Sequence, residues 1–175
     1  MRIYADTSVF GGVFDKEFAE PTNRLFAEID SGRFTLVTSA IVEAEIEPAP
    51  QRIRDFFARY EATAEIAELT QETILLQQQY IKSGIVTENS ADDALHVAIA
   101  TISQCSLIVS WNFKHIVHFD KIPKYNAVNT LTRRSRNQKG TGGLWLWVGP
   151  RQQRRGDEPV CRTSPRGNLQ RTVVL

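Results

Sequence analysis

Four side chains with hard oxygen donors occur at points of this sequence where a strand would end or a helix would begin. Asp6 follows the apolar run at 2–5, Glu45 and Asp93 lie on segments with helical periodicity, and Asn112 follows the run SLIVSW. Carboxylate and amide oxygens suit Mg²⁺ or Mn²⁺ better than zinc. A cluster of this kind supports phosphodiester hydrolysis, in which the metal activates water, neutralises charge developing on phosphorus and assists the leaving oxygen.

The elements that would position these groups alternate along residues 1–130. Helical segments between nearly all of the strands indicate right-handed crossovers and one central parallel sheet. The run at 106–111 is apolar through its centre, which is typical of a strand covered on both faces. Strands are predicted at 2–5, 34–38 and 106–111, and helices at 21–31, 53–60, 70–83 and 91–103, with a shorter one that starts after Ser39 and ends before Pro48.

A parallel sheet of this type would bring the four side chains together. Ligands bind beyond the carboxyl ends of its strands. Asp6 follows the first strand, the helix that carries Glu45 follows the second, and Asn112 follows the strand at 106–111. We therefore expect one shared edge. Acids a few ångström apart repel one another, which makes a divalent metal their natural partner.

Glu45 is the glutamate of the segment SAIVEAEIE that is predicted to face inward. Glu43 and Glu47 pair with each other at helical spacing, whereas Glu45 shares the face of the apolar residues. No Lys or Arg lies between positions 34 and 51. A buried Glu45 would therefore need another source of positive charge, which a metal ion would supply.

Two acids compete on the segment NSADDALHVAIA. Ser90 followed three residues later by Asp93 resembles a capping box, and both Asp92 and Asp93 suit the positive end of a helix. This structural interpretation explains both acids without a metal. The metal interpretation selects one of them to complete the set of four.

Length and composition are those of a single globular domain. The chain has 175 residues, of which 42% are hydrophobic and 23% charged, enough for one full core. No apolar run approaches the roughly 18 residues of a membrane span, and no signal segment opens the chain. We expect a soluble cytoplasmic protein. Cys105 and Cys161 have no metal-ligand spacing and are expected to be reduced thiols.

The net charge of +1 is unevenly distributed. Residues 1–130 carry 11 Lys/Arg against 18 Asp/Glu, a balance of −7, and residues 131–175 carry 10 against 2, a balance of +8. This tail mixes Arg, Gly, Gln and Pro with short apolar pieces, so it is expected to be disordered or loosely packed. Two interpretations remain open, a basic arm that binds nucleic acid and a tail without selected structure.

The motifs DTSVF, SAIVEAEI, DDALHVAIA and SWNFKHI, in this order, resemble the PIN domain and, within it, the VapC-like toxins of prokaryotic toxin-antitoxin pairs. The resemblance covers about residues 1–130. It implies an α/β fold, a three-layer α/β/α sandwich with a central, mainly parallel sheet. It also implies a Mg²⁺- or Mn²⁺-dependent ribonuclease with an RNA substrate, an antitoxin partner and a homodimer.

The resemblance also implies roles for individual residues. Asp6, Glu45 and Asp93 match the three acids of the family, which act as metal ligands and catalytic groups. Asn112 occupies the fourth position, which is Asp in many relatives. The amide lowers the negative charge of the site by one and should weaken metal affinity, so it is open whether one metal or two bind. YNAVNTL resembles the closing strand segment of such domains.

A second group of candidates surrounds these four and consists of Thr7, Ser8, Asp92 and Ser110. The three hydroxyls could hydrogen-bond to carboxylates, although turn capping explains Thr7 and Ser8 equally well. Asp92 remains as the competitor of Asp93.

Three histidines and a lysine are weaker candidates. His96 lies one helical turn from Asp93, and packing is a simpler explanation for it than orientation of an acid. Lys114 and His115 could contact phosphate, although exposed loop residues of this kind are usually inert. His115 and His118 suggest zinc only weakly, because no second pair completes a site.

Two other functions are compatible with parts of this pattern. The first is a non-catalytic PIN-like module that binds RNA or protein without cutting it. Asn112, in place of a fourth acid, and the altered tail are the features that suggest this alternative. A phosphotransfer domain also places Asp after a parallel strand. Aspartyl phosphatases, however, need a second Asp two residues on, where this chain has Ser8.

Overall fold

A computed structural model of the protein describes residues 1–135 and 145–147. Its centre is a five-stranded sheet with the order β3-β2-β1-β4-β5, in which every neighbouring pair is parallel. The strands are β1 (Arg2–Ala5), β2 (Thr35–Ser39), β3 (Glu65–Ala67), β4 (Leu107–Val109) and β5 (Trp145–Trp147). The predicted parallel α/β architecture is confirmed.

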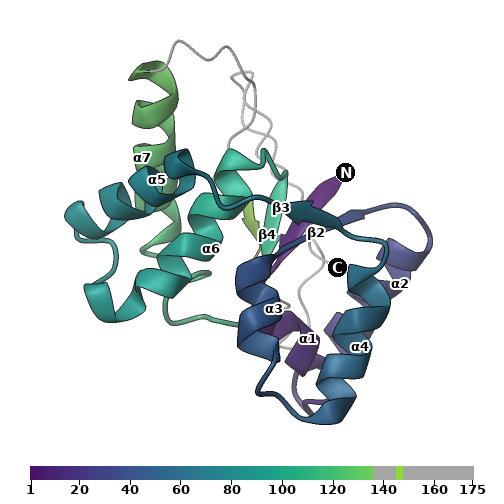
Figure 1. Cartoon of the computed structure of the whole chain (residues 1–175). Helices are drawn as coiled ribbons and strands as arrows, with labels where there is room; N and C mark the ends of the chain where they lie inside the picture. The colour runs from purple at the N-terminus through teal and green to yellow at the C-terminus, as the bar shows by residue number, and fades with distance from the viewer. Residues whose placement is uncertain (136–144, 148–175) are drawn as a thin grey trace, which may run out of the picture.

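Helices cover both faces of this sheet. They are α1 (Thr7–Gly12), α2 (Ala19–Asp30), α3 (Ala40–Ile46), α4 (Gln51–Glu61), α5 (Gln71–Lys82), α6 (Ala91–Ile102) and α7 (Ile122–Ser135), with a 3₁₀ turn at Glu88–Ser90. In Figure 1, α1 to α4 lie on one side of the strands and α5 to α7 on the other. This arrangement is the three-layer sandwich that the resemblance implies.

The strand order explains why the helices divide in this way. The chain moves from β1 outward through β2 to β3, and then returns past β1 to β4 and β5. Right-handed crossovers in opposite directions must lie on opposite faces of the sheet. The direction reverses between β1 and β4, and the carboxyl ends of strands at such a switch point form the usual ligand crevice of α/β sheets. Asp6 and Asn112 follow these two strands.

The central strands are buried because both faces are covered. Ile3, Tyr4 and Ala5 of β1 have no exposed surface, and Ile108 of β4 has none either. Helix α6 is buried along most of its length, from Ala94 to Thr101. The acids that follow these elements are therefore held by rigid, fully packed parts of the molecule.

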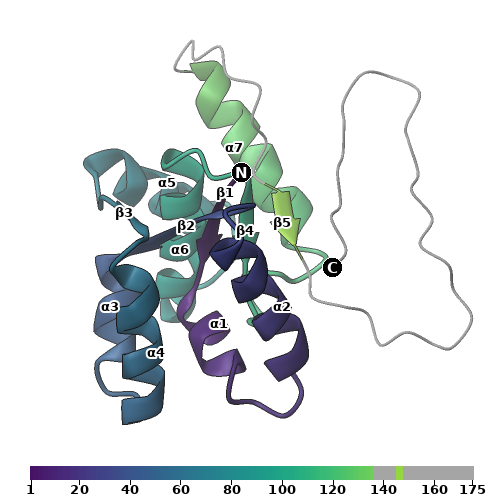
Figure 2. The same cartoon turned by 90° about the vertical axis from the view of Figure 1, so that its right-hand side faces the viewer.

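One expectation about the carboxyl-terminal part of the chain is wrong. The segment YNAVNTL forms part of helix α7 instead of a closing strand. Tyr125 and Asn129 lie on one face of that helix, and both are buried against Tyr80 of α5. The fifth strand comes instead from Trp145–Trp147 of the predicted tail, which pairs with β4, as Figure 2 shows.

The predicted boundary at residue 130 falls inside α7. The remainder of the predicted tail, residues 136–144 and 148–175, lies outside the described residues. Over the part of the chain that the structure describes, no helix is long and apolar enough to cross a membrane.

Candidate active site

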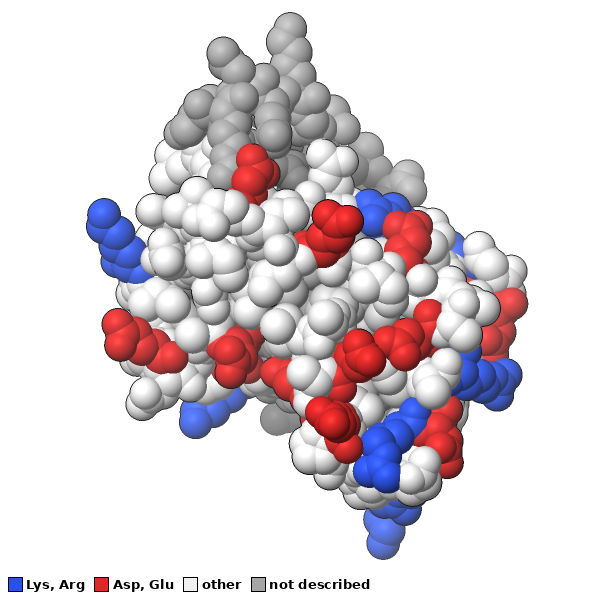
Figure 3. Space-filling view, in the orientation of Figure 1, with Lys and Arg blue, Asp and Glu red and all other residues white. Residues whose placement is uncertain are grey.

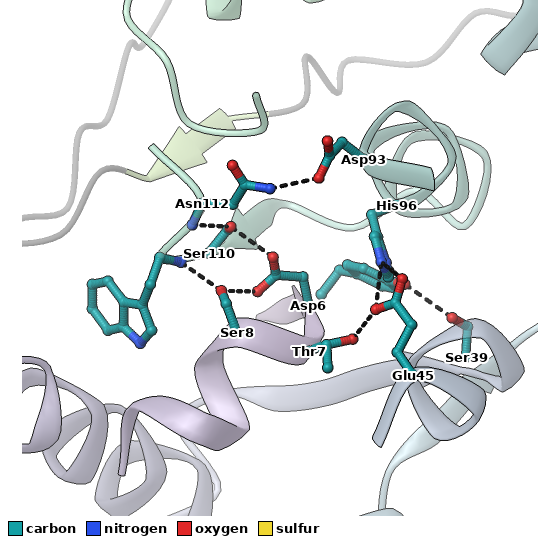
Figure 4. A network of polar contacts seen from close by, with 11 residues as sticks. Asp6, Thr7, Ser8, Ser39, Glu45, Asp93, His96, Ser110 and Asn112 are labelled. Atoms are coloured by element: carbon teal, nitrogen blue, oxygen red, sulfur yellow. Dashed lines mark hydrogen bonds and ion pairs between the residues drawn. The ribbon is translucent and has the colours of Figure 1, made fainter. Parts of the chain in front are cut away.

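The four predicted side chains come from different elements and meet at one edge of the sheet. Asp6 directly follows β1, Glu45 lies on α3, Asp93 lies in the first turn of α6, and Asn112 follows β4. Figure 4 shows two separate sets of hydrogen bonds: Ser110 and Asn112 link Asp6 to Asp93, and Thr7 and His96 hold Glu45. The four side chains therefore lie along one edge of the sheet.

Asp6 is the buried centre of this network. Its side chain occupies the N-cap position of α1 but makes no capping hydrogen bond. Instead the Ser8 hydroxyl donates to Oδ1 at 2.6 Å and the Ser110 hydroxyl donates to Oδ2 at 2.7 Å. Asp6 is only 3% exposed. The carboxylate thus belongs to a site and does not cap the helix that follows it.

The two serines are themselves fixed by the backbone after β4. The Trp111 amide donates to Ser8 Oγ at 2.8 Å, and the Asn112 amide donates to Ser110 Oγ at 2.9 Å. Each hydroxyl accepts one hydrogen bond and directs its own hydrogen at Asp6. The predicted role of Ser8 and Ser110 as partners of a carboxylate is seen directly.

Burial makes the charged form of Asp6 costly. It raises the pKa of the carboxyl above its ordinary value, and the charge of His96 and the two serine hydroxyls offset only part of this effect. Among the described residues, the side chain forms no ion pair with Lys or Arg. A nearby cation would remove most of the cost.

Glu45 is held by two donors and is more exposed than the sequence suggested. His96 Nε2 lies 3.2 Å from its Oε2 atom, and the Thr7 hydroxyl also donates to Oε2. The Glu45 side chain is 36% exposed. The expectation of a buried Glu45 without a protein cation is therefore wrong, because the carboxylate is partly exposed and its partner is an imidazole from α6.

His96 belongs to a line of hydrogen bonds that crosses the sheet edge. Its Nδ1 atom lies 2.9 Å from the Tyr4 hydroxyl, which lies 2.9 Å from Ser39 Oγ. Ser39 occupies the N-cap position of α3 but makes no capping hydrogen bond with its side chain. The simple packing role expected for His96 is incomplete, since the ring is buried and also contacts an acid of the site.

The charges of this site act together on His96. Burial alone would lower its pKa, but the hydrogen bond to Glu45 and the charges of Asp6, Glu45 and Asp93 raise the pKa above its ordinary value. For Glu45, burial alone would raise the pKa, but the hydrogen bonds from His96 and Thr7 lower it. Glu45 therefore contacts this imidazole directly, and the charges of Asp6 and Asp93 act on it as well.

Asn112 presents its amide nitrogen to the site. Its Nδ2 atom donates to Asp93 Oδ1, and its Oδ1 atom accepts from the His115 backbone amide at 3.0 Å. In this arrangement Asn112 orients a carboxylate and its oxygen is already engaged. Its role as a metal ligand would require the amide to turn.

Asp93, and not Asp92, enters the network. Asp92 is exposed, whereas Asp93 is half-buried and bonded to Asn112. Ser90 occupies the N-cap position of α6 without a capping hydrogen bond from its side chain. The capping-box interpretation of Ser90 and Asp93 is therefore not supported.

The donor set suits a hard divalent cation in its chemistry but is not gathered around one point. Within residues 1–135 and 145–147, no three Asp, Glu, His or Cys side chains are placed to share one ion. Their oxygens are engaged by hydroxyl, imidazole and amide donors instead. Three carboxylates with an excess of negative charge fit Mg²⁺ or Mn²⁺. Binding of the ion would require some of their present hydrogen bonds to break.

Sequence reasoning missed the group formed by Tyr4, Ser39 and His96. Tyr4 lies in a buried strand and has no exposed surface, so its hydroxyl group needs a hydrogen-bond partner inside the protein. Its position just before Asp6, with Ser39 at the end of the neighbouring strand, was a usable signal. The partner on α6 depends on how that helix crosses the sheet, which local periodicity does not give.

The protein is therefore a three-layer α/β domain with acidic side chains beyond the carboxyl ends of β1 and β4, where the strand order changes direction. The sequence model of the PIN domain matches residues 3–122. The chain belongs to the PIN domain family.

Among solved structures, the chain is similar to one described as the crystal structure of VapBC2 from Rickettsia felis bound to a DNA fragment from their promoter. The two share 17% sequence identity with a TM-score of 0.49, over 66% of this chain and 93% of that one. No curated protein matches this sequence.

Proposed function

We propose that the protein is a Mg²⁺- or Mn²⁺-dependent endoribonuclease that acts in the cytoplasm. The observation that carries this proposal is the convergence of Asp6, Glu45 and Asp93 at the switch point between β1 and β4. Membership of the PIN domain family supports it, and the three acids lie in the motifs through which the sequence resembles that family.

Asp6, Glu45 and Asp93 would hold the metal, with Asn112 as a further ligand or as the group that orients Asp93. When bound, the metal supplies positive charge that activates water and stabilises the negative charge developing on phosphorus. It would also offset the burial of Asp6, the acid with least access to solvent. The amide at position 112 leaves one negative charge fewer to bind a second ion.

The surrounding residues prepare the acids for this role. Ser8 and Ser110 fix both oxygens of Asp6, and Asn112 fixes one oxygen of Asp93. Glu45 is ionised through its lowered pKa and is partly exposed. Glu45 is thus a carboxylate that can meet a substrate or a metal ion from solvent.

The proposed biological role is that of a toxin restrained by an antitoxin. The order of the four motifs resembles VapC-like toxins, and an antitoxin segment would act by covering the acidic site. A homodimer is proposed on the same ground. Inspection of the adjacent reading frame for a small DNA-binding protein tests the toxin role, and sedimentation of the purified chain tests the dimer.

Cleavage of total RNA tests the enzymatic proposal. The purified protein and its Asp6→Ala variant are incubated with RNA, with and without Mg²⁺ or Mn²⁺. We expect cleavage only by the unmodified protein and only with metal. Equal cleavage by the two proteins, or none by either, would overturn the proposal.

Two matched pairs of variants sharpen this test. Glu45→Gln should abolish cleavage, whereas Glu43→Gln on the same helix removes an equal charge outside the network and should not. Asp93→Asn and Asp92→Asn form the second pair on α6. If the two members of a pair behave alike, that acid has no specific role.

A non-catalytic module is the second candidate, and the orientation of Asn112 favours it. Its oxygen accepts from His115 and its nitrogen meets Asp93, so the fourth position offers the site a donor. Such a module would bind RNA or a protein without metal. Calorimetry with Mn²⁺ separates the two, because the module neither binds the ion nor gains thermal stability from it.

A further inference from the structure

The loop between β4 and α7, with the first turn of α7, is basic in an otherwise acidic domain. This basic loop, residues 113–124, contains three Lys and one Asp, a balance of +2, together with two His. Residues 1–112 contain 8 Lys/Arg and 17 Asp/Glu, a balance of −9. On the face shown in Figure 3, acidic side chains run in a band across the surface. A surface of that kind repels a polyanion, so the basic loop is exceptional.

The basic loop is attached directly to the acidic site. The His115 backbone amide donates to Asn112 Oδ1 at 3.0 Å, and the Val117 amide donates to the Asn112 backbone oxygen, also at 3.0 Å. Lys121 Nζ lies 2.9 Å from His115 Nδ1. The charge of Asp93 acts on both His115 and Lys121. Cationic groups therefore stand beside the acids proposed to carry out cleavage.

The lysines of the loop are not neutralised within the described residues. None of Lys114, Lys121 and Lys124 forms an ion pair with a described carboxylate. Burial lowers the pKa of Lys121, and the charges of Lys114 and Lys124 lower it further, against the opposing charge of Asp93. An external anion would relieve this repulsion.

An aromatic surface adjoins the same loop. Phe113 follows Asn112 and is 40% exposed. Its ring centroid lies 6.0 Å from that of Phe18 and 6.4 Å from that of Trp111, and those two rings stack on each other at 5.0 Å. Phe113 is therefore an exposed ring supported from behind. A ring of this kind can stack with an unpaired base.

We propose that Phe113 and the lysines of the basic loop form the surface that binds single-stranded RNA beside the acidic site. Lys114, Lys121 and Lys124 would contact backbone phosphates, and Phe113 would stack with one base. Stacking requires a base that is free of a duplex, so the surface selects single strands. The inference rests on the proposed ribonuclease function and names the part of the molecule that holds its substrate.

Fluorescence anisotropy with a labelled single-stranded RNA oligonucleotide tests this surface. The full chain is used in EDTA, so that binding is measured without cleavage. We expect the double variant Lys114→Ala/Lys121→Ala to bind about tenfold more weakly, with a shallower dependence on salt. Phe113→Ala should also weaken binding about tenfold. An unlabelled RNA duplex should compete poorly.

Matched controls separate a local surface from general charge. Arg33→Ala/Arg59→Ala removes the same charge on the β2–β3 side of the sheet, away from β4, because Arg33 precedes β2 and Arg59 lies in the last turn of α4, which leads to β3. Phe119, 64% exposed in the same loop, provides a control for Phe113. Thermal melting verifies that every variant folds. Equal losses in variants and controls would overturn the proposal, as would unchanged binding in all of them.

The same preparations distinguish this proposal from the nuclease proposal. Cleavage that depends on Asp6 and metal, with RNA binding that is insensitive to the basic loop, would overturn the RNA surface alone. Binding that depends on the basic loop and Phe113, without any metal-dependent cleavage, would support the surface and overturn the nuclease.

Discussion

His96 Nε2 lies 3.2 Å from Glu45 Oε2, so a buried imidazole from α6 orients an acid on α3. An ionised carboxylate can only accept a hydrogen bond, which requires the hydrogen of the ring to reside on Nε2. In the neutral ring, Nδ1 then accepts from the Tyr4 hydroxyl. Glu45 therefore selects the tautomer, and the Tyr4 hydroxyl, which can donate or accept, holds the other side of the ring.

Replacement of His96 should therefore affect both stability and metal use. We expect His96→Ala to lower the free energy of unfolding by about 3 kcal/mol, because it leaves a cavity and removes the buried partner of Tyr4. His96→Gln retains a donor for Glu45 and should lose less. The measurements are urea unfolding and the Mn²⁺ concentration for half-maximal RNA cleavage. If both variants lose stability but need the same Mn²⁺ concentration for half-maximal cleavage, His96 has a packing role and does not position Glu45.

The raised pKa values of Asp6 and His96 predict how stability depends on pH without metal. A group whose folded pKa is raised binds more protons in the folded state, so its contribution to stability is lost as the pH rises through the folded pKa. For His96 the contribution is complete below about 6.5, its unfolded value. Urea midpoints in EDTA should fall as the pH rises above about 6.5.

A variant of Asp6 tests the charge itself. In EDTA at about pH 8, Asp6→Asn should raise the melting temperature by roughly 2–4 °C, the shift that about 1 kcal/mol produces in a chain of this size. Mn²⁺ should stabilise the unmodified protein and leave the variant unchanged. A variant that melts lower than the unmodified protein in EDTA would contradict the interpretation of Asp6 as a costly buried charge.

Asn112→Asp should convert a donor into a fourth acid. The change removes the hydrogen bond from Nδ2 to Asp93 and places two carboxylates side by side, which then share a proton in the metal-free protein. We expect lower stability in EDTA and about tenfold tighter Mn²⁺ binding, equivalent to roughly 1.4 kcal/mol. Isothermal titration calorimetry measures the affinity. Unchanged Mn²⁺ affinity would place Asn112 outside the metal site.

The sequence was sufficient wherever local pattern and topology agree. β1, β2 and β4 and the helices α2 to α6 follow from apolar periodicity and capping signals, whereas α1 and β3 were not predicted. The parallel sheet then brings Asp6 and Asn112 to the same edge. The closing strand expected at YNAVNTL came from the family resemblance and is wrong, because Tyr125 and Asn129, four residues apart, lie on one buried face of helix α7. Pairing of Trp145–Trp147 with β4 and contact between His96 and Glu45 depend on tertiary packing, which local pattern does not encode.

Gly12 provides a test of how far packing behind the site controls it. A Cβ atom at Gly12 would lie 2.5 Å from Trp111 Nε1 and 2.8 Å from Thr22 Oγ1, two atoms that are themselves hydrogen-bonded at 3.1 Å. The Trp111 backbone amide in turn holds Ser8, and Ser8 holds Asp6. A methyl group at position 12 must therefore displace the segment that arranges the acids.

Gly12→Ala should lower the free energy of unfolding by about 1–3 kcal/mol through overpacking. Displacement of the acids should also slow RNA cleavage by about tenfold or more. Gly11 is the matched control in the same helix, since a Cβ atom there meets nothing within 4 Å. Gly11→Ala should be neutral or stabilising by up to about 1 kcal/mol. The measurements are the free energy of unfolding in urea and the rate of RNA cleavage for both variants. If Gly12→Ala and Gly11→Ala behave alike, Trp111 accommodates the added methyl group without moving Ser8, and the prediction is wrong.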